Sequence, residues 1–170
     1  MIRVGVMRGG PSSEYDVSLN TGANVLSHLR SDAMNAKYKP IDILIDKDGA
    51  WHMGGRPTSL EQVSKSVDVI FNALHGDFGE DGKVQTLLEQ WSIPYTGSGP
   101  FPSAVGYNKV LAKKQFAQLG IKTPQYVLYE PSDYDTGVTV EELAGERAKK
   151  VWQKFGAPWV VKPASSGSSV

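Results

Sequence analysis

A nearly continuous apolar run over residues 67–74 constrains the fold of this chain more than any other feature. A strand with one face in water alternates apolar and polar residues, whereas a strand covered on both faces is apolar almost throughout. The glycine-rich stretch at residues 75–82 then ends the run. The pattern therefore predicts a buried strand in a parallel or mixed sheet that has helices packed on it.

The rest of the chain alternates short apolar runs with amphipathic segments, so the predicted fold class is α/β. The predicted strands cover residues 2–7, 41–45, 67–74, 93–95, 125–129 and 159–162, with a hairpin arm at Trp51. One predicted helix opens at residues 11–14, and others cover residues 80–91, 103–119 and 140–155. Because residues 97–100 are the best linker candidate, we expect an N-terminal α/β domain over residues 1–98 and an incomplete second domain over residues 99–170.

Composition excludes several classes of function. The 170 residues include no cysteine, which excludes disulfides, thiolate zinc sites and a cysteine nucleophile. Eighteen basic residues balance 18 acidic ones, so charge gives no argument for nucleic acid or an anionic membrane as a partner. The apolar runs are far shorter than the roughly 20 residues that cross a bilayer, and the N-terminus resembles a strand more than a signal peptide. We therefore expect a cytoplasmic protein.

Two polar clusters follow predicted strands, where open α/β sheets bind ligands. The first, residues 9–14, combines small residues with Glu14 at the start of a helix, but it lacks the lysine of a P-loop and the glycine spacing of a dinucleotide fold. A tight turn would explain it equally well. The second, residues 75–82, contains His75, Glu80 and three glycines, which is more than a turn needs. Its carboxylates are suited to orienting a cation or an ammonium group, although a glycine-rich loop that opens a helix remains the alternative.

Two lysines indicate a phosphate site. In the helix predicted over residues 103–119, Lys109 lies in the middle of an apolar stripe, so it must either extend to solvent or meet an anion. That stripe consists of Val105, Ala112, Phe116 and Leu119. Lys162 ends a predicted strand and precedes small hydroxyl residues and glycine, which hold phosphates through ammonium, hydroxyl and N–H donors. A flexible serine-rich tail is the alternative for this segment.

In order along the chain, these motifs resemble the D-alanine–D-alanine ligase family of the ATP-grasp superfamily. The matching stretches are residues 9–14 with Val17-Ser18-Leu19, residues 75–82 with Gln85, residues 94–99 with Ser103-Ala104 and Asn108-Lys109, and residues 161–163 with 167–170. The resemblance covers essentially the whole chain. It implies a Rossmann-like pre-ATP-grasp domain followed by the first part of an ATP-grasp α+β domain. Thr86 and Tyr107-Asn108 depart from the family's commoner residues, and none of them is a proposed catalytic group.

The resemblance implies a two-step reaction for peptidoglycan precursor synthesis. ATP phosphorylates the carboxylate of one D-alanine, and the amine of a second D-alanine attacks the acyl phosphate. By resemblance, Glu14 and Ser168 are catalytic, with Glu14 orienting the ammonium group of the first D-alanine. His75 and Glu80 would line the substrate end of the site together with Glu14.

For the nucleotide, the resemblance implies that Lys109, Lys162 and Ser169 contact the phosphates of ATP. It implies Mg²⁺ as well, with ligands that come from a part of the family's sequence that this chain lacks, so we expect no metal ligand within these 170 residues. Members of the family commonly pair through the N-terminal domain, which suggests a homodimer.

Family members are much longer than this chain, so we expect a truncated or proteolysed piece that is inactive by itself. Three alternatives remain open. One is a ligase that joins D-alanine to D-lactate or D-serine, and another is a different ATP-grasp carboxylate–amine ligase. The third is a non-catalytic ligand-binding module of flavodoxin-like architecture, in which Lys109 and Lys162 would be packing residues.

Overall fold

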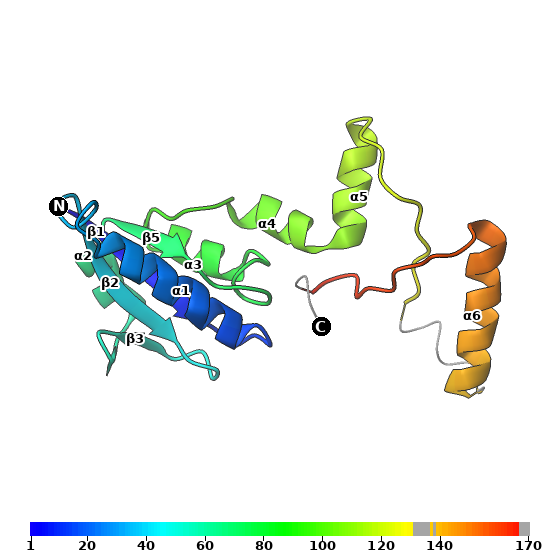
Figure 1. Ribbon diagram of the computed structural model, residues 1–170, viewed down its shortest axis with the longest axis horizontal. Coiled ribbons are helices and arrows are strands. Elements are labelled where there is room, and N and C mark those ends of the chain that lie inside the picture. The colour runs from blue at the N-terminus through cyan, green and yellow to red at the C-terminus, as the bar shows by residue number, and fades with distance from the viewer. Residues whose placement is uncertain (131–136, 138, 167–170) are drawn as a thin grey trace. The chain divides into compact units, whose positions relative to one another are not determined.

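The computed structural model describes residues 1–130, 137 and 139–166 (Figure 1). The chain forms two compact units, of which the first holds Met1–Ala112 and the segment that begins at Ser165. The second unit holds Lys113–Ala164. Compactness and independent folding are different properties, so the domain boundary expected between residues 98 and 99 remains a prediction.

The first unit is built on a five-stranded sheet with the strand order β4-β3-β2-β1-β5. The strands are β1 (Ile2–Gly9), β2 (Tyr38–Ile45), β3 (Trp51–Met53), β4 (Arg56–Pro57) and β5 (Val69–Asn72). β1 runs parallel to both β2 and β5, whereas β3 is antiparallel to β2 and to β4. The sheet is therefore mixed, and the predicted α/β class is confirmed.

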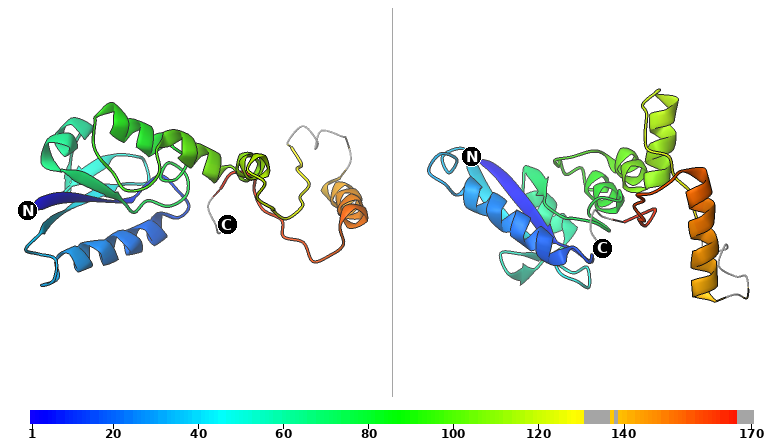
Figure 2. Two further views of the ribbon diagram at one scale, coloured as in Figure 1. Left: turned by 90° about the horizontal axis from the view of Figure 1, so that it is seen from above. Right: turned by 45° about the vertical axis from the view of Figure 1, so that its right-hand side comes forward.

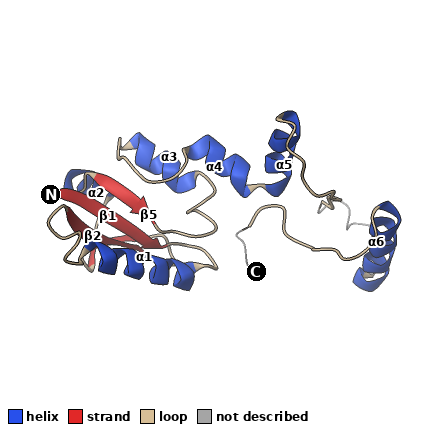
Figure 3. Ribbon diagram, turned by 45° about the horizontal axis from the view of Figure 1, so that its top comes forward, coloured by secondary structure: helices blue, strands red, loops and turns tan. Residues whose placement is uncertain are grey.

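Helices cover both faces of this sheet. α1 (Tyr15–Leu29) lies on one face, and α2 (Leu60–Ser66) and α3 (Lys83–Gln90) lie on the other, as Figures 2 and 3 show. The remaining helices are α4 (Pro100–Tyr107), α5 (Lys109–Gln118) and α6 (Val140–Lys154). α5 begins in the first unit and ends in the second, to which α6 belongs.

The alternation of side chains along β1 produces two cores. Val4 and Val6 pack with Leu26 of α1, whereas Met7 packs on the other face with α2 and α3. The apolar run at residues 67–74 contributes to both cores, because Ile70 faces α2 and α3 while Phe71 faces α1. A single parallel bridge between Ile70 and Tyr95 covers the outer side of β5. A strand is confirmed over residues 69–72 of the predicted 67–74, with side chains packed on both of its faces.

The strand predicted over residues 93–95 is reduced to a single bridge at Tyr95, and two further predicted strands are absent from the described residues. Neither 125–129 nor 159–162 makes strand hydrogen bonds, and the side chain of Val161 is 95% exposed. A strand requires a partner, and the described part of the second unit offers none. The prediction of strands at residues 125–129 and 159–162 was therefore wrong.

The helix predicted over residues 103–119 is also wrong as a single element. It is divided into α4 and α5 by Asn108, whose backbone is extended at φ −89° and ψ 108°. The Asn108 side-chain oxygen accepts hydrogen bonds from the backbone N–H groups of Val110 and Leu111, both at 3.0 Å. An asparagine that satisfies the first N–H groups of a helix is an N-cap, and it starts a new helix here.

None of the helices that the structure describes is both long and apolar enough to span a bilayer.

Candidate functional site

The loops that follow β1 and β5 lie at the same end of the sheet, where the two strands terminate. The two strands are parallel neighbours, so both loops leave from the same end of the sheet. The chain then crosses to opposite faces, since α1 follows β1 and α3 follows β5 (Figure 3). A pair of neighbouring strands whose connections diverge in this way is the usual ligand-binding position of an open α/β sheet.

Ser18, on α1, connects these two loops through the hydrogen bonds of its hydroxyl group. Its hydroxyl accepts a hydrogen bond from the Gly9 N–H at 2.8 Å and donates one to the Ala73 carbonyl, also at 2.8 Å. The Ser18 side chain is completely buried. Because Gly9 ends β1 and Ala73 follows β5, this one hydroxyl fixes the ends of both strands relative to each other.

The Glu14 carboxylate reaches across to the second loop. Glu14 precedes α1, and its side chain makes no capping hydrogen bond to that helix. It lies against Gly76, where an added Cβ atom would be 2.6 Å from Glu14 Oε2 and 2.6 Å from Ser12 Oγ. Gly76 also has a φ of +71°, a conformation that side chains disfavour. The two predicted polar clusters therefore form one site.

His75 and Glu80 complete the same cluster. His75 Nδ1 lies 3.8 Å from Glu80 Oε1, and Glu80 Oε2 accepts a hydrogen bond from the Gly76 N–H at 3.1 Å. On its other side, His75 Nε2 lies 3.0 Å from the hydroxyl of Thr21. Sequence reasoning missed Thr21, although Glu14, Ser18 and Thr21 share one helical face at intervals of four and three residues.

A set of hydrogen bonds makes the loop at residues 75–82 rigid. The side-chain amides of Asn72 and Gln85 both donate to the Gly79 carbonyl, at 3.0 and 2.9 Å. Asp81 accepts from the N–H groups of Phe78 and Lys83 and forms an ion pair with the Lys83 ammonium at 2.7 Å. Burial raises the pKa of Asp81, but these hydrogen bonds outweigh it and leave the pKa below its usual value.

Tyr107 connects α4 to this loop. Its hydroxyl donates a hydrogen bond to the Asp77 carboxylate at 2.7 Å. Burial, followed by that hydrogen bond and the charge of Asp77, raises the pKa of Tyr107 far above its ordinary value. The phenol is therefore a permanent donor that holds α4 to the loop.

Lys109 occupies a different position from the one predicted. It is the first residue of α5 and does not lie in the middle of an apolar stripe, because the predicted helix is interrupted at Asn108. Its ammonium group donates to the Ser166 carbonyl at 3.0 Å, and the Asn108 side-chain amide donates to Ser165 Oγ at 3.0 Å. Ser165 and Ser166 thus lie beside the start of α5.

The structure does not bring every predicted residue into this arrangement. Lys162 belongs to the second unit and is exposed. Ser168 and Ser169 lie outside the described residues. Within the described ranges, no group of three or more His, Cys, Asp or Glu side chains is placed to hold a metal ion.

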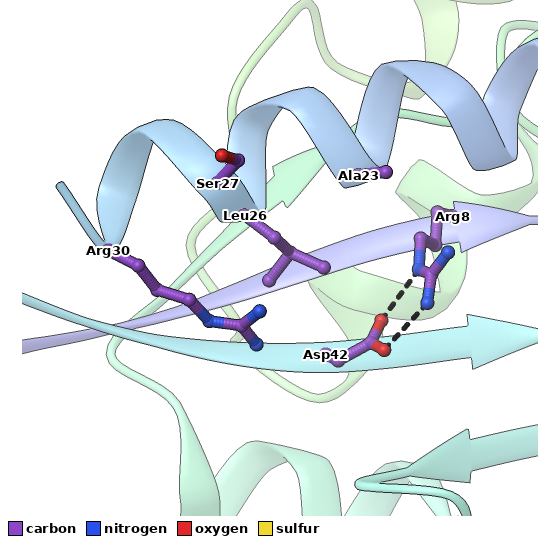
Figure 4. A pocket seen from close by; sticks show the side chains of 6 residues that line it. All are labelled: Arg8, Ala23, Leu26, Ser27, Arg30 and Asp42. Carbon is purple, nitrogen blue, oxygen red and sulfur yellow. Dashed lines mark hydrogen bonds and ion pairs between the residues drawn. The ribbon is translucent and has the colours of Figure 1, made fainter.

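A separate cavity of about 290 Å³ lies between α1 and β2 (Figure 4). Arg8 and Asp42 form a two-point ion pair in it, with both nitrogen–oxygen distances at 2.7 Å. That hydrogen bonding with Asp42 raises the pKa of Arg8 despite partial burial. Arg8 and Asp42 are therefore paired with each other, and the cavity contains none of the predicted site residues.

Comparison with known proteins identifies the group to which this fold and loop arrangement belong. The family model described as the D-ala D-ala ligase N-terminus matches residues 3–64 and 55–98, which is more than half of the chain. The chain belongs to the D-alanine–D-alanine ligase family. A D-alanine–D-alanine ligase from Geobacillus thermodenitrificans is 37% identical over 200 aligned residues, which include 99% of this chain and 52% of that relative.

Similarity to solved structures supports this family assignment. The D-alanine–D-alanine ligase from Coxiella burnetii superposes with a TM-score of 0.72 at 27% identity, over 92% of this chain and 50% of that one. The VanG D-Ala:D-Ser ligase from Enterococcus faecalis gives a TM-score of 0.70 at 25% identity, over 98% and 53% of the two chains. The chain therefore spans about half the length of the family members that it matches.

Proposed function

We propose that this chain supplies the first D-alanine site and the leading edge of the ATP site of a D-alanine–D-alanine ligase. The observation that carries the proposal is that Glu14 lies against Gly76, the neighbour of His75 and the hydrogen-bond partner of Glu80, at the carboxyl ends of β1 and β5. Membership of the ligase family supports it as well. Under this proposal Glu14 binds the ammonium group of the substrate, and His75 and Glu80 line the same end of the site.

The proposed phosphate site begins at Lys109. Its ammonium group lies at a helix start beside the carbonyl of Ser166, so it can turn from that carbonyl to an anion without a change in the fold. Lys162 and Ser169 would add further donors in the assembled enzyme. A positive charge fixed near a transferring phosphoryl group stabilises the negative charge that develops there.

ATP, when bound, supplies the phosphoryl group that activates the D-alanine carboxylate, and Mg²⁺ offsets the charge of the phosphates. The lysine at the start of α5 fits the nucleotide half of this requirement. Because the chain spans about half the length of its relatives, we propose that the Mg²⁺ ligands lie in the other half of the ligase.

The test is release of ADP that depends on D-alanine. A protein of the relatives' full length should turn over, whereas we expect the 170-residue chain alone to be inactive. In that full-length ligase, called the long protein below, Glu14→Gln should lower kcat/KM at least about 100-fold, which corresponds to roughly 2.7 kcal/mol of transition-state stabilisation. Glu61→Gln is the matched control, since Glu61 lies in an exposed ion pair on α2 and should leave turnover unchanged. Unchanged turnover in the Glu14 variant would end the proposal.

Charge removal tests the ATP site separately. Lys109→Met and Lys162→Met should each weaken ATP binding without unfolding the protein, while Lys65→Met on the α2 surface should not. If both the ATP affinity and the stability stayed unchanged in the first two variants, their assignment to the nucleotide would be wrong.

One observation supports a second substrate other than D-alanine, namely the similarity of this chain to the VanG D-Ala:D-Ser ligase. Dipeptide formation measured with D-alanine, D-serine and D-lactate as competing acceptors would decide among the three, and we propose D-alanine. A homodimer and a cytoplasmic location also remain proposals.

A further inference from the structure

Thr21 is placed to control the histidine of the proposed D-alanine site. It lies on α1, one turn beyond the buried Ser18, and its side chain is half-buried. The Thr21 hydroxyl has two neighbours at the same distance, the Val17 carbonyl at 3.0 Å and His75 Nε2 at 3.0 Å. Val17 and Thr21 are separated by one turn of helix, whereas His75 is 54 residues away.

Counting protons assigns the direction of these two hydrogen bonds. A hydroxyl carries one hydrogen, and a carbonyl can only accept. If Thr21 donates to the Val17 carbonyl, it has only lone pairs left for His75, so the hydrogen in the second bond must belong to Nε2. The reverse direction gives up the bond to Val17, because the one hydroxyl hydrogen cannot serve both partners.

The surroundings of the other ring nitrogen oppose this assignment only weakly. His75 Nδ1 is 3.8 Å from Glu80 Oε1, beyond the 2.7–3.2 Å range of an N–H···O hydrogen bond. The second oxygen of Glu80 is already engaged by the Gly76 N–H. The carboxylate therefore attracts a proton on Nδ1 only through space, while Thr21 offers Nε2 a bond of ordinary length.

We propose that Thr21 is a positioning residue that keeps a proton on His75 Nε2 and turns Nδ1 toward Glu80. The importance of this for the ligase rests on the proposed function. The χ2 torsion of a histidine has two broad wells, so the ring of the partly exposed His75 could otherwise turn by about 180° and exchange the places of its two nitrogens. With Thr21 as a fixed acceptor, Nδ1 stays on the side of Glu80, and the ring presents one defined edge to a substrate.

The test reads the histidine directly by nitrogen NMR. Long-range ¹H–¹⁵N spectra of the chain labelled at histidine should give three imidazole patterns, for His28, His52 and His75, and His75→Gln identifies the third. With the ring neutral, we expect the His75 pattern to be that of an Nε2–H imidazole. Thr21→Val has the same shape without the hydroxyl, and it should convert at least half of the His75 signal to the Nδ1–H form or to an exchange average.

Two further variants separate positioning from packing. Thr21→Ser restores the hydroxyl and should restore the Nε2–H pattern. Thr86→Val removes a hydroxyl that makes the same bond to a carbonyl one turn back, to Gly82 at 2.8 Å in α3, and it should leave the His75 signal unchanged.

The proposal is overturned if His75 is an Nδ1–H imidazole in the unsubstituted chain, or if Thr21→Val leaves its pattern unchanged. It is equally overturned if Thr86→Val has the same effect as Thr21→Val. None of these readouts requires turnover, so a ligase assay that fails for Glu14→Gln would reject the proposed function and leave the role of Thr21 standing.

Discussion

At the scale of the residue, the missing side chain of Gly76 is part of the proposed site. An added Cβ atom would lie within 2.6 Å of Glu14 Oε2, so Gly76→Ala must push the carboxylate away. We expect the KM for D-alanine in the long protein to rise about tenfold or more, equivalent to about 1.4 kcal/mol. The measurement is initial-rate kinetics with ATP saturating.

Gly49→Ala is the matched control for this substitution. Gly49 has a similarly positive φ of +85°, but no atom lies within 4 Å of its added Cβ. Both variants therefore bear a backbone strain of about 1 kcal/mol or more, and only one displaces a site residue. An equal rise in KM for the two variants would show that strain, and not the position of Glu14, is responsible.

Some residues of the proposed site can be recognised from the sequence alone, and others cannot. Glu14, His75 and Glu80 stand out because ionisable residues beside glycines are more than a turn requires. Thr21 does not stand out, because a hydroxyl inside a helix commonly bonds to the preceding turn and gives no sign of a distant partner. Its role depends on a contact that exists only after β1 and β5 have paired.

At the scale of the element, Asn108 decides where one helix ends and the next begins. Asn108→Ala removes the acceptor for two backbone N–H groups at the start of α5, so we expect a loss of about 1 kcal/mol in the free energy of unfolding. In a continuous helix the sign would be reversed, since alanine favours helix interiors more than asparagine does. Urea unfolding followed by circular dichroism measures this sign.

Asn108→Asp refines that result, because it keeps the capping oxygen and removes only the amide that donates to Ser165. We expect most of the lost stability to return in this variant. A helix stabilised by Asn108→Ala would contradict the division into α4 and α5.

The sequence predicted helices and strands correctly where the signal lies within the segment itself. It failed where strand formation depends on a pairing partner elsewhere in the chain. β1, β2 and β5 follow from short apolar runs, and α6 follows from a stripe that begins after Thr139, whose side chain caps it. β4 has no apolar run and was not predicted. α2 was missed although Ser59 and Gln62 form a capping box, because seven residues give little periodic signal. The segments at 125–129 and 159–162 have strand composition, but pairing depends on residues elsewhere in a chain.

At the scale of the whole molecule, an exposed ion pair ties the first strand to the last. Arg3 on β1 donates to the Asp68 carboxylate at 2.7 Å and to the Lys65 carbonyl at 2.9 Å. The Arg3 side-chain hydrogen bond holds the pKa of Asp68 below its usual range. A carboxyl with a lowered folded-state pKa adds stability above its unfolded pKa and loses it as the pH falls through the folded value.

The difference in urea midpoint between the unsubstituted chain and Asp68→Asn should therefore be present at pH 7 and disappear as the pH is lowered below about 4. It should also shrink at high salt, since the Arg3 and Asp68 side chains are 40% and 42% exposed. Asp48→Asn, in the exposed turn between β2 and β3, is the control. A difference that persisted unchanged at pH 2.5 would rule out this ion pair as its source.

The buried hydroxyl of Ser18 has a consequence for how folding and ligand binding are linked. It joins Gly9 to Ala73, so the loops acquire their places only when segments 55 residues or more apart have come together. Such non-local contacts form late, after the entropy of closing the intervening loop has been lost. A small molecule held by both loops would bind the folded chain and not the unfolded one. At concentrations well above its Kd, it would then raise the melting temperature roughly with the logarithm of its concentration, so the melting temperature of the chain would report how far the site is occupied.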